Sequence, residues 1–168
     1  EEGYHVTDGL TNKPTPADVK RAVRLTPLAG GCAPITFILT SFPGVRMHAG
    51  ALFTAAYPSC GCNACDENWV GAADELEWQT LAIAGGGFTE EVSEPRRPKW
   101  SFDRNHGFTQ GMGQTISYRL RALDGLVETS GKSHADNVPV AVMRQARSTL
   151  NEVAELSPEG NWLPWPLR

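Results

Sequence analysis

The amino-acid sequence predicts an α+β fold in which an antiparallel sheet, a meander plus a later hairpin, is packed by about three helices. Two observations predict it. Runs with the alternation or β-branched density of strands follow one another across short turns. Runs with helical spacing of apolar residues stand before, between and after these strands. The 168 residues contain no internal repeat and no long linker, so we expect one domain over residues 1–168.

The first predicted element is a helix. Thr15 is a suitable N-cap, and Pro16 suits the first helical position. Apolar residues follow at helical spacing, at Val19, Ala22 and Val23. Pro27 is expected to end this helix.

Three strands are expected next. Residues 35–40 are β-branched and aromatic, and 45–49 alternate between apolar and polar side chains. Phe42-Pro43-Gly44 between them fits a type II turn. With a third strand over 52–57, the pattern predicts an antiparallel meander.

A second helix is predicted after the cysteine-bearing loop of residues 58–66. Its apolar stripe consists of Trp69, Ala72, Ala73, Leu76, Thr80 and Ile83. Gly85-Gly86-Gly87 is expected to end it. A short strand over 88–92 is expected to follow.

A hairpin is predicted late in the chain. Residues 116–122 alternate, and Asp124-Gly125 is the preferred pair for a two-residue turn. Residues 126–129 would return as the second strand, and 130–137 would form a polar loop.

The last predicted helix spans 139–156. Its inward residues are expected to be Val140, Met143, Ala146, Leu150 and Val153. Two nearby prolines exclude a helix over 161–166. Because two exposed indoles would form an adhesive patch, we expect Trp162 and Trp165 to pack on their own domain.

Composition and charge exclude several classes of protein. The net charge of −4 argues against nonspecific nucleic-acid binding, which needs a basic surface. No stretch reaches the roughly 18 apolar residues of a membrane span, and the first residues show no pattern of a signal peptide. Three of the four cysteines fall within six residues, unlike a framework of spaced disulfides. We therefore expect a cytoplasmic protein.

The segment Cys60-Gly61-Cys62-Asn63-Ala64-Cys65-Asp66-Glu67 is the strongest chemical signal. Small intervening residues let three sulfurs converge on one point, and a tetrahedral zinc ion needs four ligands. His48, on the polar face of a predicted strand, is the first choice for the fourth ligand. The other candidates are Cys32, His106, Asp66, Glu67 and a water molecule. The predicted metal ligands are thus Cys60, Cys62, Cys65 and His48.

Two other interpretations of this segment stay open. Cys62 and Cys65 form a C-x-x-C pair next to a helix start, where the positive helix end lowers the pKa of a thiol. The pair would then serve a thiol-dependent redox enzyme. Alternatively, the cysteines are inert small residues, and Asp66 caps the helix.

Other motifs are weaker indications of function. Gly131-Lys132-Ser133 misses the phosphate-loop spacing, and Ser133-His134-Ala135-Asp136 holds triad residue types only as neighbours in one loop. No acid, base and nucleophile stand out together. The sequence therefore favours a non-catalytic binding or scaffold domain with a structural zinc, and the redox enzyme is the alternative.

Phe42-Pro43-Gly44, the segment from Tyr57 to Glu67 and the glycine-closed helix after it resemble a bacterial family of single-domain proteins of unknown function, which carry a C-G-C-x-A-C-D-E signature. The resemblance covers most of the chain, including the aromatic and proline-rich tail. It implies that the cysteine segment is a family feature, and it brings no reaction, substrate or cofactor. The resemblance also implies an aspartate where this chain has Asn63.

Overall fold

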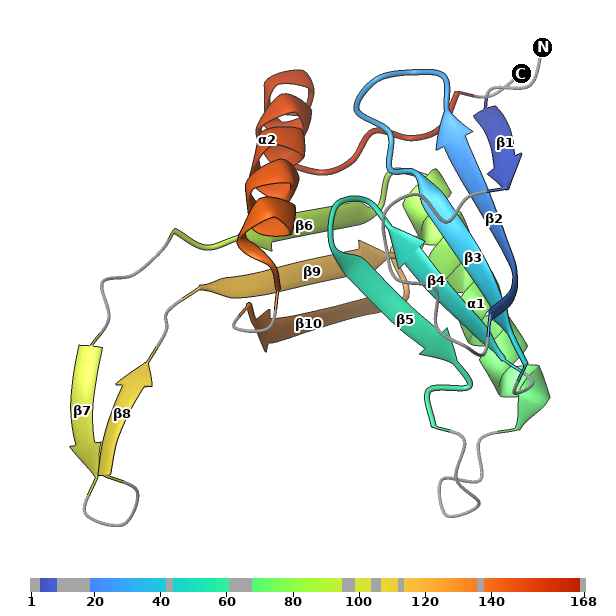
Figure 1. The fold of residues 1–168 in the computed structure, drawn as a ribbon. Coiled ribbons are helices and arrows are strands. Elements are labelled where there is room, and N and C mark those ends of the chain that lie inside the picture. Colours follow the sequence, from blue (N-terminus) through green and yellow to red (C-terminus); the bar gives the residue numbers. More distant parts are fainter. Residues whose placement is uncertain are drawn as a thin grey trace.

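The computed structural model describes residues 4–8, 19–41, 44–60, 68–94, 99–103, 107–111, 114–135 and 138–166. These residues form two helices and ten strands, and the strands make three antiparallel sheets (Figure 1). The predicted α+β class is confirmed. Neither helix in this part of the chain is long and apolar enough to cross a membrane.

The largest sheet is a five-stranded meander in which neighbouring strands follow one another along the chain. The predicted meander over 35–40, 45–49 and 52–57 is confirmed, and two further strands precede it. The five strands are β1 (Tyr4–Asp8), β2 (Val19–Pro27), β3 (Ile35–Thr40), β4 (Val45–Ala49) and β5 (Phe53–Tyr57).

The predicted first helix is wrong, because Val19–Pro27 is the strand β2. This strand pairs with β3 from Val19 opposite Thr40 to Leu25 opposite Ile35, and it pairs with β1 on its other side. Its β-branched residues suit a paired strand, so sheet pairing overrides the local helical spacing. The predicted cap at Thr15 and the residues Phe42-Pro43 of the predicted turn lie outside the described residues.

The second sheet has the strand order β10-β9-β6, with β6 (Phe88–Val92), β9 (Thr115–Arg121) and β10 (Glu128–His134). β6 confirms the predicted short strand. A two-stranded ribbon of β7 (Lys99–Asp103) and β8 (Gly107–Gly111), which the sequence analysis did not anticipate, projects away from both larger sheets (Figure 1).

The predicted later hairpin is confirmed, because β9 and β10 pair antiparallel, but its connection is longer than the predicted two-residue turn at Asp124-Gly125. Six residues, 122–127, connect β9 to β10, and the Asp124 carboxylate accepts a hydrogen bond from the Leu126 N–H at 2.9 Å. Residues 130–134, expected in a loop, belong to the largely exposed edge strand β10. Backbone pairing with β9 stabilises this strand, although its side chains show no alternation of apolar and polar residues.

The two later helices are confirmed as α1 (Trp69–Ala84) and α2 (Val140–Leu156). Their first residues do not point inward as predicted, since the side chains of Trp69 and Val140 are 81% and 75% exposed. The first turn of each helix thus contributes little to the core. The buried residues of α1 are Ala72, Gln79, Ala82 and Ile83.

The core joins both larger sheets through aromatic rings. The Phe53 and Phe88 centroids are 5.5 Å apart at a steep angle, and Trp162 stacks on Phe88. The backbone N–H of Trp162 donates to the Phe88 carbonyl, and the backbone N–H of Leu163 donates to the Gly31 carbonyl, each at 2.8 Å. Residues 161–165, here called the C-terminal strap, therefore tie the two sheets together, and the predicted packing of the indoles is confirmed.

Candidate functional site

The cysteine loop lies between β5 and α1. Cys60 stands three residues beyond the end of β5, while residues 61–67, with Cys62 and Cys65, lie outside the described residues. The convergence of the three sulfurs therefore stays a prediction. In the described ranges, no group of three or more His, Cys, Asp or Glu residues could hold a metal ion.

His48 lies on β4, directly opposite Thr54 of β5. Its Nδ1 is 2.8 Å from the Thr54 hydroxyl, and Nε2 could bind a metal in the tautomer whose Nδ1–H donates to that hydroxyl. The register pairs Val45 with Tyr57 at the end of β5. His48 is three residues farther along β4, or about 10 Å at strand spacing. The segment that follows Cys60 must turn back over the sheet to share a metal with His48.

Cys32 belongs to a different end of the molecule. It precedes β3, whose first residue Ile35 pairs with Ala49, at the sheet end opposite to the cysteine loop. Its Sγ donates to the Pro164 carbonyl at 3.3 Å, and burial raises the pKa of the thiol. The Cys32 thiol is therefore held by the C-terminal strap, and its place among the candidate fourth ligands stays a prediction.

The start of α1 bears on the other two interpretations of the loop. Asn68 is the N-cap, and its side-chain oxygen accepts a hydrogen bond from the Gly71 N–H at 2.8 Å. The helix does not need Asp66 as its cap. Cys65 precedes this cap by three residues, and the stabilisation of a thiolate by the helix dipole falls off within the first turn. The helix end therefore supports the redox interpretation only weakly.

A buried carboxylate that the sequence analysis missed lies between the two sheets. Glu90 of β6 is 4% exposed. It accepts hydrogen bonds from three consecutive backbone N–H groups, those of Ala51, Leu52 and Phe53, at 2.8, 2.9 and 2.7 Å. The indole N–H of Trp162 donates to it at 3.1 Å. Glu90 thus joins β6, the β4–β5 turn and the C-terminal strap.

These hydrogen bonds define the role of Glu90. Burial raises the pKa of the carboxyl group, and the four donors oppose that effect. Because both oxygens accept two hydrogen bonds each, the group is not available as a general base or nucleophile. A sequence signal existed, because alternation along 88–92 places Glu90 on the same face as Phe88 and Val92.

Gly50 allows this close approach, and its substitution gives a testable prediction. Its φ is +57°, and a Cβ there would collide with the Glu90 carboxylate and lie 2.8 Å from the Phe88 ring. We expect Gly50→Ala to lower the free energy of unfolding by about 2–5 kcal/mol, from backbone strain and overpacking.

The control is Gly125→Ala. Gly125 has a φ of +72°, but a Cβ there would meet nothing within 4 Å. Only the backbone cost of about 1–2 kcal/mol is expected. Urea unfolding of both variants measures the difference, and equal losses would contradict the predicted collision.

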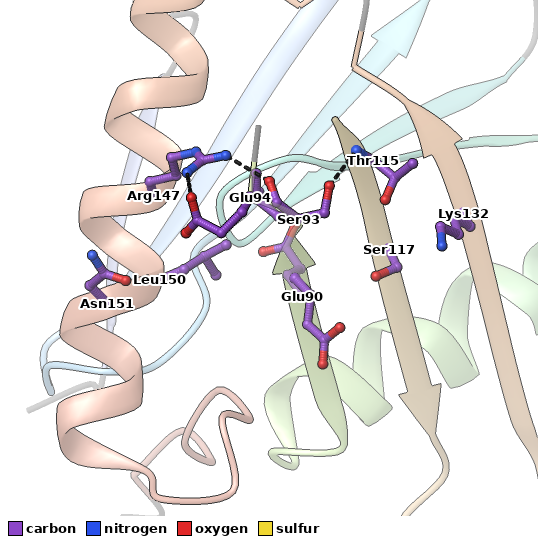
Figure 2. A pocket seen from close by; sticks show the side chains of 11 residues that line it. Glu90, Ser93, Glu94, Thr115, Ser117, Lys132, Arg147, Leu150 and Asn151 are labelled. Carbon is purple, nitrogen blue, oxygen red and sulfur yellow. Dashed lines mark hydrogen bonds and ion pairs between the residues drawn. The ribbon is translucent and has the colours of Figure 1, made fainter. Parts of the chain in front are cut away.

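A polar cavity of about 430 Å³ lies between α2 and the second sheet. Figure 2 shows Arg147 and Asn151 of α2 on one side, with Ser117 and Lys132 on the other. Arg147 donates to the Ser93 carbonyl at 2.7 Å and forms an ion pair with Glu94 at 3.4 Å. The lining holds three glutamates, Glu90, Glu91 and Glu94, and two cations, Lys132 and Arg147, so the cavity contains charges of both signs.

A larger cavity of about 710 Å³ lies between α2 and residues 29–34 of the connection from β2 to β3. Its lining includes Trp162 and the turn residues Gly50 and Ala51, so it adjoins the donors that hold Glu90. The candidate site of this protein therefore has two parts, the cysteine loop and this cavity beside α2.

The family model of a family of unknown function, DUF6226, matches residues 1–168. The chain belongs to the DUF6226 family. No curated protein and no solved structure matches the chain. For this DUF6226 protein, function must therefore be argued from the site itself.

Proposed function

We propose that this DUF6226 protein is a non-catalytic binding or scaffold protein. In this proposal, Cys60, Cys62, Cys65 and His48 hold a structural zinc ion that fixes the cysteine loop onto the start of α1. A metal with four protein ligands is closed to substrate, so the site serves structure. The proposal also treats the segment 60–67 as a feature shared by other family members.

The observation that carries the proposal is the capped start of α1. Asn68 caps the helix, so neither Asp66 nor the cysteines are required there. Three cysteines within six residues of a connecting loop then need another reason, and zinc coordination supplies one. The hydrogen bond between His48 Nδ1 and Thr54 supports His48 as the fourth ligand, since metal-binding histidines are usually held by their other nitrogen.

Zinc content tests this proposal directly. We expect about one zinc per chain in protein purified without chelator, and a loss of nearly all of it in Cys62→Ser. Elemental analysis measures the metal, and a thermal melt with and without chelator measures its effect on stability. His48→Ala should release zinc more readily to a competing chelator, because one of four ligands is lost.

Cys32→Ser is the matched control, since Cys32 lies at the other end of the sheet and should leave zinc content unchanged. Alkylation kinetics give the second readout. Metal-bound thiolates should react slowly until chelator is added. Metal-free protein with one rapidly alkylated thiol, at Cys62 or Cys65, would refute the zinc site and favour the redox enzyme.

A further inference from the structure

The cavity between α2 and residues 29–34 has the size and lining of a small-ligand site. Its volume of about 710 Å³ lies within the roughly 300–1,000 Å³ of typical ligand pockets. Gly30 and Gly31 line it from the β2–β3 connection, and residues of α2 and Trp162 line it as well. Figure 1 shows the β2–β3 connection passing beside α2.

Much of the lining is apolar and partly open to water. Val142 and Leu156 of α2 line the cavity, and their side chains are 38% and 54% exposed. Val153 of the same helix, which is buried, also lines the cavity. An apolar group in the cavity would remove these side chains from water, which favours binding.

Two side chains of opposite charge line the cavity from different elements. Arg24 comes from β2 and Glu152 from α2. The Arg24 Nε donates to the Thr26 hydroxyl at 3.4 Å, and Glu152 accepts from the Ser148 hydroxyl at 3.4 Å. In the described part of the chain, neither forms an ion pair with another residue. The cavity thus presents one cation and one anion to its contents.

We infer that this cavity binds a short apolar peptide with free termini. The peptide carboxylate would bind the Arg24 guanidinium, whose planar fork matches a carboxylate. Its ammonium group would face Glu152, and its side chains would cover Val142 and Leu156. A purely apolar ligand would leave both the Arg24 and the Glu152 side chains without a charged partner. A ligand that carries only a negative charge would be repelled by Glu152. The inference rests on the proposed binding role and does not require the zinc.

The probe is L-leucyl-L-leucine, compared with its C-terminal amide and its N-acetyl form by calorimetric titration. We expect the dipeptide to bind about tenfold more tightly than either blocked form, since each loses one charge-assisted contact. Arg24→Gln should weaken the dipeptide about tenfold and leave the amide unchanged. Glu152→Gln should weaken the dipeptide and leave the N-acetyl form unchanged.

Glu155→Gln is the matched control, because Glu155 is an exposed residue of α2 outside the cavity lining. It should bind all three peptides as the unaltered protein does. Thr149→Trp, which fills the cavity from α2, should abolish binding while the protein still melts cooperatively. Absence of dipeptide binding at millimolar concentration, or equal losses for acid and amide in Arg24→Gln, would overturn the inference.

Zinc analysis of the same samples separates this inference from the metal site. Zinc-loaded protein that does not bind the dipeptide would overturn the peptide site and leave the zinc proposal standing. Zinc-free protein that binds it with the expected dependence on Arg24 and Glu152 would confirm the peptide site and refute the metal.

Discussion

Replacing Glu90 with alanine is expected to lower the free energy of unfolding by about 3–5 kcal/mol. The substitution leaves the backbone N–H groups of Ala51, Leu52 and Phe53 and the indole N–H of Trp162 without their acceptor at a buried site. A buried donor without an acceptor costs more than an average hydrogen bond contributes, because it loses water and gains nothing. Urea unfolding followed by tryptophan fluorescence measures the loss.

Glu91→Ala is the control for this experiment. Glu91 is the next residue of β6, and its side chain is exposed. The exposed substitution should change stability by no more than about 0.5 kcal/mol. Glu90→Gln should fall between the two, since an amide keeps one acceptor oxygen but turns an N–H group toward other donors. Equal stabilities of the Glu90→Ala and Glu91→Ala variants would show that the hydrogen bonds to Glu90 do not hold the core.

Glu90 illustrates which parts of the fold the sequence could predict. The meander, β6 and the two later helices follow from local patterns, since apolar side chains there recur at the spacing of the element they form. The strand β2 was missed because its spacing also fits a helix, and only pairing with β1 and β3 decides between the two. The extension of β10 was missed because an exposed edge strand needs backbone partners and no apolar face.

One part of the candidate site could likewise be predicted from the sequence, and the other part could not. The cysteine segment is visible in the sequence because its residues are neighbours along the chain. The two charges of the cavity are not visible in this way, because Arg24 and Glu152 line one cavity only through the packing of α2 beside the β2–β3 connection. Alternation along β6 indicates that Glu90 is buried. Its hydrogen-bond donors cannot be predicted, because they belong to the β4–β5 turn and the C-terminal strap, which are distant in sequence.

Trp162→Ala is expected to lower the free energy of unfolding by about 3–5 kcal/mol. The indole is 2% exposed, stacks on Phe88 and donates to Glu90, so its removal opens a cavity and leaves a buried carboxylate with one donor fewer. Trp69→Ala deletes the same side chain from a site that is 81% exposed. It should change stability by no more than about 0.5 kcal/mol, and similar losses for both would contradict the role of the C-terminal strap.

Trp162→Phe separates the two contributions of the indole. It keeps an aromatic ring against Phe88 and removes the pyrrole part of the indole, including the N–H that donates to Glu90. If that hydrogen bond couples the C-terminal strap to β6, the substitution should cost less in a Glu90→Ala background than in the unaltered protein. We expect a coupling energy of about 0.5–3 kcal/mol from the double-mutant cycle. Strictly additive losses would mean that the hydrogen bond from the indole to Glu90 does not couple the C-terminal strap to β6, with Glu90 serving only the β4–β5 turn.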